Sequence, residues 1–325
     1  MTSATTSPTL TKLRRRLLAW YRKHGRDLPW RRVDDPYHAM VAEFMLQQTG
    51  VARVLPVYDS FLRRFPSLKA LADAPVSDVI RAWSGMGYNR RAINLQRTAR
   101  VIVDEHNGVI PGDPHTLEKL PGIGRYTAAA IACFAFQRPV AVMDTNIRRV
   151  LGRLIAGHSD IDADAGWTLA EAAVPSDGTR ASAWHQALMD LGATVCSARR
   201  PKCGECPVND LCAARPLFDS ANQDGTNRPQ LQYAELSDTL PTLKVAEHPQ
   251  PKQQGWIGTT RYYRGRIVET LRNHSNGTLP LDELGPLVTD DYIATRHSEW
   301  LQELLTALER DGLVAVSGEM AGLPE

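Results

Sequence analysis

The chain of 325 residues lacks a hydrophobic run long enough to cross a bilayer, because its longest apolar stretch, 127–136, is far shorter than a membrane helix. The first ten residues are rich in serine and threonine and contain no apolar signal core. No charge sign dominates either, since 38 Lys and Arg residues stand against 36 Asp and Glu residues. We therefore expect a cytoplasmic protein with no membrane partner, and the net charge of +2 does not by itself indicate a nucleic-acid binder.

Cysteine is scarce, and four of the five cysteines lie within seventeen residues. Cys196, Cys203, Cys206 and Cys212 form the pattern C-x6-C-x2-C-x5-C. Disulfides are not expected in the cytoplasm, and clustered thiolates select zinc or iron–sulfur clusters. Structural zinc sites more often use two separated C-x2-C pairs, whereas one C-x2-C pair with wider flanking gaps suits a loop wrapped around a cubane. The spacing favours a [4Fe–4S] cluster over 196–212, with zinc as the alternative.

The order of helical and irregular segments predicts an all-α protein followed by a small C-terminal module. Helical periodicity runs through 10–24 and 36–215 without sustained strand-like alternation. Composition shifts after Leu217, so we predict three parts: a helical domain over 1–217, a linker over 218–256 and a module over 257–325. The module combines helical patterns with a short strand at 313–316, which fits a small winged-helix unit or a simple helical cap.

A glycine-containing turn at 117–127 indicates a helical hairpin. Gly122 and Gly124 permit a tight turn and remove side chains that would block a close approach. The amides that open the next helix then form an anion site, which can hold a DNA phosphate without reading sequence. We predict that four residues here bind DNA: Leu120, Gly122, Gly124 and Arg149. Arg149 belongs to one of several basic pairs along the chain.

Several motifs, in one order, make the chain resemble the helix–hairpin–helix DNA glycosylases with an iron–sulfur loop, and most closely their adenine glycosylase (MutY-like) family. The likeness covers roughly 13–212 and rests on the segments at 28–31, 43–49, 83–88, 120–126, 142–150 and 189–193, with the four cysteines in register. It implies a two-lobed helix–hairpin–helix fold and a duplex DNA substrate with a mismatched or damaged pair. We expect a monomer in the bacterial cytosol or nucleoid.

Two carboxylates suit the cleavage of an N-glycosidic bond, in which the departing base needs a proton and the sugar needs a nearby negative charge. Glu43 lies in the apolar run 40–46, and an acid among apolar neighbours can stay protonated near neutral pH. We assign Glu43 to protonate the purine ring and then help to activate water. Asp144 is assigned to stabilise the sugar cation as an anion, or it is a plain helix N-cap. The resemblance implies the same assignment and leaves open a transient covalent bond to Asp144.

Further site residues follow from the resemblance alone. The related lyases form a Schiff base through a lysine at the position of Tyr126, and tyrosine cannot do so, which implies base removal without strand cleavage. Tyr126 and Asn146 would help to place the sugar and the water. Gln48 and Tyr88 would fill the gap that a flipped-out base leaves. The candidates for the adenine pocket are Arg26, Trp30, Arg31, Leu46, Val51 and Gln186.

One departure from the family concerns the C-terminus. Many members carry a domain related to nucleotide-diphosphate hydrolases that inspects 8-oxoguanine opposite the adenine, and nothing after Leu217 resembles it. The predicted activity is hydrolytic removal of adenine mispaired with 8-oxoguanine or guanine. The alternatives are a glycosylase for hypoxanthine, uracil or thymine, and a non-catalytic DNA-binding or redox-sensing iron–sulfur protein.

Overall fold

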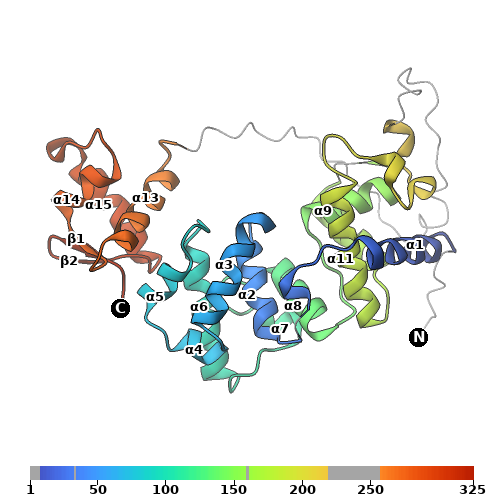
Figure 1. Ribbon diagram of the computed structural model, residues 1–325, viewed down its shortest axis with the longest axis horizontal. Coiled ribbons are helices and arrows are strands. Elements are labelled where there is room, and N and C mark those ends of the chain that lie inside the picture. Colours follow the sequence, from blue (N-terminus) through green and yellow to red (C-terminus); the bar gives the residue numbers. More distant parts are fainter. Residues whose placement is uncertain (1–7, 33, 159–160, 219–256) are drawn as a thin grey trace. The chain divides into compact units, whose positions relative to one another are not determined.

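The computed structural model describes residues 8–32, 34–158, 161–218 and 257–325 (Figure 1). The predicted linker 218–256 lies outside this range except for its first residue, and the predicted domain boundaries stay a prediction. The described chain is helical with one small three-stranded sheet, which confirms the predicted fold class. None of its helices is long and apolar enough to span a membrane.

The chain divides into two compact units that interleave in sequence. The first unit comprises Met1–Asp34, Gly112–Pro114 and Arg125–Pro249, and the second comprises Asp35–Pro111, His115–Gly124 and Gln250–Glu325. The helices described in the first unit are α1 (Pro8–His24), η1 (Pro29–Arg31), α8 (Arg125–Phe136), α9 (Thr145–Leu151), η2 (Gly152–Ala156), α10 (Ala163–Ala173), α11 (Gly178–Thr194), η3 (Cys203–Glu205), η4 (Asn209–Leu211) and η5 (Arg215–Phe218). Those of the second unit are α2 (Pro36–Leu46), α3 (Val51–Arg64), α4 (Leu68–Ala72), α5 (Val76–Ala82), α6 (Arg90–Glu105), α7 (Pro114–Leu117, which begins on the last residue of a first-unit segment), α13 (Thr260–Asn273), α14 (Leu281–Val288) and α15 (Ala294–Arg310).

The core of the first unit forms around α11. Helices α1 and α9 pack against it, and Trp184 and Leu188 on α11 are fully buried. Aspartate caps explain where α10 and α11 begin. Asp162 accepts a hydrogen bond from the Ala165 amide, and Asp177 accepts one from the Arg180 amide. This packing holds in place the segment 139–143, which leads into α9.

His185 on α11 is fully buried and forms hydrogen bonds at both ring nitrogens, one of them to that segment. Its Nδ1 lies 2.8 Å from the Ala181 carbonyl oxygen, which can only accept, so Nδ1 carries the proton. Its Nε2 accepts from the Val142 amide at 3.0 Å, two residues before Asp144. The ring is therefore neutral, and burial lowers the pKa of His185 to about 4, against a smaller raising effect of the bond to Ala181.

In the second unit, α2 packs against α3 and α6, and its buried residues run without a break from Ala39 to Met45. Asp35 caps α2 by accepting from the Tyr37 amide, and Pro36 occupies the first helical position. Because α2 packs on both sides, Glu43 within this buried stretch is largely removed from water.

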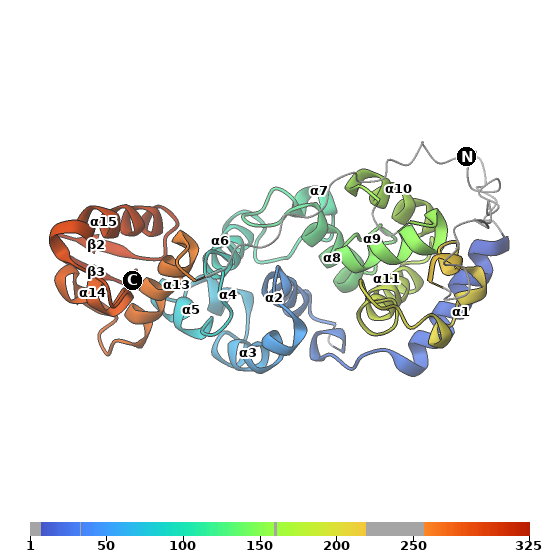
Figure 2. The same cartoon turned by 90° about the horizontal axis from the view of Figure 1, so that it is seen from above.

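The C-terminal module (257–325) joins α13, β1 (Thr278–Pro280), α14, α15, β2 (Ala315–Ser317) and β3 (Met320–Gly322) in this order. The sheet order is β1-β3-β2, with both pairs antiparallel. Figure 2 labels β2 and β3 of this sheet, with α13, α14 and α15 around them. Three helices with such a sheet form a winged-helix arrangement, so of the two alternatives the simple helical cap is wrong. The predicted strand at 313–316 begins two residues early, because Leu313 and Val314 are buried under the module's helices before pairing starts.

The module shares its core with α5 and α6. Ile80 on α5 and Ile93 on α6 pack with Ile267, Val268 and Leu271 of α13. At the other end of the module, the amide of Ser77 donates to the Pro324 carbonyl at 2.9 Å. The last residues of the chain are thus tied to the start of α5, and the module is part of the second unit.

Neutral His185 predicts an acid-dependent loss of stability. Between about pH 6.5 and pH 4 the unfolded state binds a proton that the folded state excludes, so folding stability falls as the pH falls through this window. A difference of roughly 2.5 pKa units corresponds to about 3 kcal/mol. We expect His185→Gln to be less stable than the unsubstituted protein at pH 7, and this difference to shrink toward pH 4.5 in urea unfolding of the holoprotein.

The control for this measurement is His115→Gln, since His115 is exposed. That variant should keep the pH dependence of the unsubstituted protein. An unchanged pH dependence in His185→Gln would contradict the assignment of a neutral buried ring.

Candidate functional site

Asp144 lies at the N-terminus of α9 and uses both carboxylate oxygens. Oδ1 accepts from the Ile147 amide at 2.6 Å, and Oδ2 accepts from the Asn146 side-chain amide at 2.9 Å. The residue is therefore an N-cap, as one reading of the sequence predicted, and the cap also orients the carboxylate. Because Asp144 is only half-buried, the capped carboxylate keeps access to solvent.

A chain of hydrogen bonds leads from Asp144 to the cysteine loop. Asn146 Oδ1 accepts from an Arg149 NH2 group at 2.9 Å, and the same guanidinium donates to the carbonyl oxygens of Gly192 and Cys196 at 2.8 and 2.9 Å. Burial lowers the pKa of Arg149, partly offset by Cys196, and the group remains a cation. Arg149 thus joins the catalytic candidates to the first cysteine, and its predicted contact with DNA stays a prediction.

Two of the predicted pocket arginines meet at Asp190, a fully buried acid on α11. Arg26 donates from its amide and Nε, at 2.8 and 2.7 Å, and Arg31 donates from both NH groups, at 2.8 and 2.9 Å. Burial alone raises the pKa of Asp190, but the hydrogen bonds and charges of Arg31 and Arg26 outweigh it, and the net pKa is lowered. The hydrogen bonds of Arg26 and Arg31 to Asp190 fix the turn after α1. Trp30 lies half-buried in this turn, in η1.

Gln186 lies one turn before Asp190 on the same helix and accepts a hydrogen bond from the Tyr21 hydroxyl group. The Tyr21 ring faces the Arg31 guanidinium at 5.8 Å. Arg26, Arg31 and Gln186 therefore belong to one polar cluster in the first unit. Tyr126, in the first turn of α8, packs half-buried against the core of this unit.

Glu43 lies in the middle of α2 and is 6% exposed. Its neighbours Ala42 and Phe44 are buried, which confirms the expected apolar surroundings. Leu46 ends α2, and Val51 begins α3, so these two pocket candidates flank one turn and are half-buried in the second unit. The other four candidates for the adenine pocket, Arg26, Trp30, Arg31 and Gln186, belong to the first unit. The adenine pocket as a whole therefore stays a prediction.

Arg91 holds the two turns that carry Gln48 and Tyr88. Although only 8% exposed, its guanidinium donates to the carbonyl oxygens of Phe44, Met45 and Gln47, to the Thr49 hydroxyl group, and to the carbonyl oxygens of Met86 and Gly87, at 2.5–3.3 Å. Burial lowers its pKa to about 10, so it stays charged at neutral pH. A basic pair such as 90–91 is typical of a solvated surface, but Arg91 is buried.

Gln48 and Tyr88 share an uncommon backbone conformation. Their φ angles are +53° and +47°, in the left-handed region that few non-glycine residues adopt. Such a conformation costs about 1–2 kcal/mol per residue, which the hydrogen bonds of Arg91 to both turns can offset. Strain of this kind gathers at functional positions. Tyr88 is 41% exposed, with the Arg91 guanidinium 5.4 Å from its ring centroid.

The glycine hairpin lies between α7 and α8. Gly122 has φ +74°, and an added Cβ would lie 2.6 Å from the Asn94 Cβ, so glycine is required there. Its carbonyl accepts from the Gln47 side chain at 3.3 Å, which ties the hairpin to the turn before Gln48. Nothing lies within 4 Å of a Cβ on Gly124, and this open space is what the approach of a phosphate would need. Leu120 is buried, so only its backbone can reach DNA.

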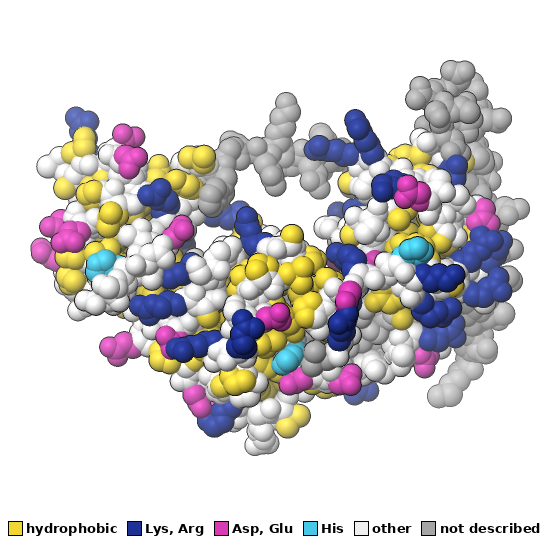
Figure 3. Space-filling model, in the orientation of Figure 1, with side chains coloured by type: hydrophobic (Ala, Val, Ile, Leu, Met, Phe, Trp, Pro, Cys, Tyr) yellow, Lys and Arg dark blue, Asp and Glu magenta, His cyan; other side chains and the backbone are white. Residues whose placement is uncertain are grey.

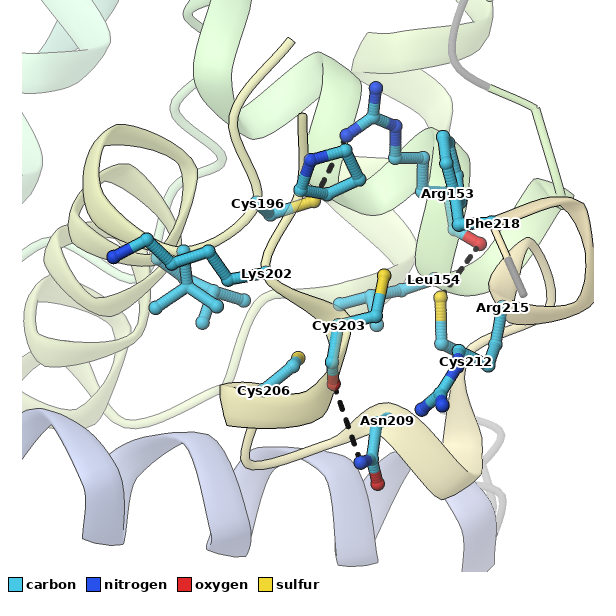
Figure 4. Close-up of a pocket in the computed structure, with 13 residues that line it drawn as sticks. Arg153, Leu154, Cys196, Lys202, Cys203, Cys206, Asn209, Cys212, Arg215 and Phe218 are labelled. Atoms are coloured by element: carbon cyan, nitrogen blue, oxygen red, sulfur yellow. Dashed lines mark hydrogen bonds between the residues drawn. The ribbon is translucent and has the colours of Figure 1, made fainter. Parts of the chain in front are cut away.

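The four clustered cysteines line one cavity at the end of the first unit (Figure 4). None forms a disulfide. Arg153, which is 2% exposed, donates to the Cys196 sulfur at 3.4 Å and to the carbonyl oxygens of Ser197 and Ala198 at 2.8 Å. Burial raises the pKa of the Cys206 and Cys212 thiols to about 11. These thiols are therefore protonated at neutral pH, and a metal that binds them would displace their protons.

The spacing of the thiols favours a cluster over a single ion. Within the described part of the chain, no three His, Cys, Asp or Glu side chains are close enough to hold one metal ion. Four cysteines around one cavity nevertheless suit a cubane, in which each sulfur binds a different iron. The cations Arg153, Lys202 and Arg215 line the same cavity and offset the negative charge of thiolate-bound iron.

The residues that the sequence pattern did not single out are Asp190, Arg91, His185 and Arg153. Asp190 lies in the segment 189–193 that carried the resemblance, and an acid in an apolar helical run was the one signal available for it. No local pattern marked Arg91 and Arg153 as buried, because most of their partners are carbonyl groups, which every residue carries.

Comparison with known proteins agrees with this geometry. The model of the HhH-GPD superfamily base excision DNA repair proteins matches residues 41–168, and the iron–sulfur binding domain of endonuclease III matches residues 196–212. The second match confirms the predicted iron–sulfur cofactor, a [4Fe–4S] cluster, and its range begins and ends on Cys196 and Cys212. The chain is 32% identical to the solved structure of a thermostable thymine-DNA glycosylase, with a TM-score of 0.59, over 64% of this chain and 96% of that one. An endonuclease III–DNA complex, at 24% identity and a TM-score of 0.55, shares the fold.

Among curated relatives, the adenine DNA glycosylase of Homo sapiens is 36% identical over 86% of this chain and 53% of its own length. The adenine DNA glycosylase of Mycobacterium tuberculosis is 42% identical over 267 residues, which cover 79% of this chain and 77% of the relative. Identity at this level over most of both chains shows that the chain belongs to the adenine DNA glycosylase family of the helix–hairpin–helix base excision repair superfamily.

Proposed function

We propose that this enzyme hydrolyses the N-glycosidic bond of adenine mispaired with 8-oxoguanine or guanine in duplex DNA and leaves an abasic site. Two observations carry the proposal: Glu43 is a buried acid on α2, and Asp144 is a capped, half-buried carboxylate at the start of α9, in a chain 42% identical to an adenine DNA glycosylase. We further propose that it acts as a monomer on chromosomal DNA in the cytoplasm.

In the proposed reaction, Glu43 donates its proton to a ring nitrogen of the flipped-out adenine, and the bond between the base and the sugar carbon breaks with its electrons leaving on the base. Asp144 stays anionic and stabilises the positive charge that develops on the sugar. Water then attacks the sugar carbon, and the Glu43 carboxylate accepts its proton. The hydrogen bond from Asn146 keeps one carboxylate oxygen of Asp144 in place, and Tyr126 contacts the sugar.

In this scheme the four cysteines of the loop 196–212 would hold the [4Fe–4S] cluster, which would fix that loop when bound. Arg149 links the loop to Asn146 and so to Asp144. The cations Arg199, Arg200 and Lys202 on the same loop are exposed and available to phosphates.

Excision of thymine from mismatches is the second candidate, because a thymine-DNA glycosylase of Aeropyrum pernix is 38% identical over 62% of this chain and 92% of its own length. The buried acid favours a purine, since protonation of a ring nitrogen assists the departure of adenine more than that of thymine.

Base release from a panel of duplexes tests the proposal. We expect adenine release opposite 8-oxoguanine and guanine, none opposite thymine, and strand breaks only after alkali, because Tyr126 cannot form a Schiff base. Release of thymine or uracil opposite guanine without adenine release would favour the second candidate. Strand breaks without alkali would contradict the assignment of Tyr126.

The substitution Glu43→Gln keeps the size of the side chain and removes the proton donor. We expect single-turnover adenine release to fall by about 10²–10⁴-fold, with the iron content and the binding of mismatched duplex retained. Retained base release would exclude Glu43 as the acid.

The substitution Asp144→Asn separates the charge of the carboxylate from its capping role, because asparagine caps helices as well as aspartate does. We expect the free energy of unfolding to change by less than about 1 kcal/mol, while base release falls by about 10²–10³-fold. Asp162→Asn is the matched control, since Asp162 caps α10 in the same way, and it should keep full activity. Equal activity in both variants would leave Asp144 with the capping role alone.

A further inference from the structure

The first turn of α13 lies directly against the candidate wedge Tyr88. The guanidinium carbon of Arg261 is 3.8 Å from the centroid of the Tyr88 ring, which is a close cation–π contact. A second arginine of α13, Arg272, donates to Ser84 and Asn89 at 3.4 and 3.2 Å, and these residues flank the same turn. The C-terminal module therefore contacts the turn 84–89 at two points, in addition to their shared apolar core.

Arg261 differs from the nearby Arg264 and Arg90 in forming no ion pair among the described residues. Arg264 and Arg90 both pair with Asp311. Arg261 is exposed, and over the described ranges of the chain no carboxylate lies within ion-pair distance of it. An exposed cation that an acid does not neutralise is available to an anionic partner.

The charges of the module are distributed unevenly between its helices. Helix α13 carries four arginines and one glutamate. Helix α15, which corresponds by topology to the helix that enters the major groove in helix-turn-helix proteins, exposes Glu299, Glu303 and Glu309 against Arg296 and Arg310. The turn between β2 and β3 adds Glu319, and α14 adds Asp282 and Glu283. Acidic side chains accordingly gather at the outer edge of the module (Figure 3).

We propose that the C-terminal module binds duplex DNA through the first turn of α13, with Arg261 contacting a phosphate beside Tyr88, and that α15 does not enter the groove. The inference rests on the proposed function, since Tyr88 meets DNA only if the chain acts on a duplex. It adds a second DNA-binding element, contributed by the module, at the point where Tyr88 would insert.

The contact between Arg261 and Tyr88 explains how the cation reaches its phosphate. A ring that inserts between bases must give up one of its faces to a base, and stacking on a base is stronger than a cation–π contact at an exposed site. Insertion of Tyr88 would thus release Arg261 within side-chain reach of the kinked backbone. Before insertion, the same contact limits the orientations of the exposed ring.

The salt dependence of binding tests the proposal with the full-length holoprotein. Binding to a duplex with one adenine–8-oxoguanine pair is measured in a Glu43→Gln background, so that the substrate is not consumed. Loss of one phosphate contact lowers the slope of log K against log salt by about 1 and weakens binding roughly tenfold at about 0.05 M salt. We expect Arg261→Gln to show both effects and Arg261→Lys, which keeps the charge, to restore the slope.

Arg296→Gln is the matched control, since it removes an exposed arginine from the first turn of α15, where a groove-binding helix contacts DNA. We expect it to leave slope and affinity unchanged. An unchanged slope in Arg261→Gln, or a slope lowered by Arg296→Gln, would overturn the proposal. Base release is measured separately in the enzyme that retains Glu43. A failure of the proposed function would appear as a lack of base release, whereas a failure of this inference would appear in the salt slope.

Discussion

The buried guanidinium of Arg91 is the constraint on which the second unit depends. Its six hydrogen bonds join the turn after α2 to the turn before α6. Burying a cation costs several kcal/mol, and hydrogen bonds to the charged group, which contribute about 1.5–3 kcal/mol each, offset that cost. This network also allows Gln48 and Tyr88 to keep left-handed backbones, and it thereby positions both candidate wedge residues from one residue in the core.

The first unit also contains a buried charged group held by hydrogen bonds, in this case an acid. Asp190 is fully buried and stays ionised because Arg26 and Arg31 supply four hydrogen bonds. On the neighbouring helix, Asp144, Asn146 and Arg149 continue into the cysteine loop. Asp144, Asn146 and the cysteine loop are therefore parts of one hydrogen-bonded framework, so loss of the cluster would disturb Asp144 through Arg149 and Asn146.

In the C-terminal module, the order of the elements and the distribution of charge point to different helices as the one that contacts DNA. Its element order is that of a winged helix, yet the helix expected to read DNA is acidic on its exposed face, and the basic helix is α13. The helical patterns predicted in this module, at 262–273 and 295–310, correspond to α13 and α15, because both have strong helical periodicity. The sequence missed β1 and α14, because three strand residues followed by an eight-residue helix with an internal proline give no periodic signal.

The sequence by itself determined the helical class, the four cysteine ligands, the hairpin glycine Gly122 and the acid Glu43 in its apolar helix, because each depends on residues that are close in the chain. Only the tertiary structure decided which charged residues are buried and what they bind. Asp190 meets Arg26 across 164 positions, and Arg272 meets Asn89 across 183. No local pattern records such a pairing, because burial and hydrogen-bond partners are set by how the helices pack and not by the order of residues along any one of them.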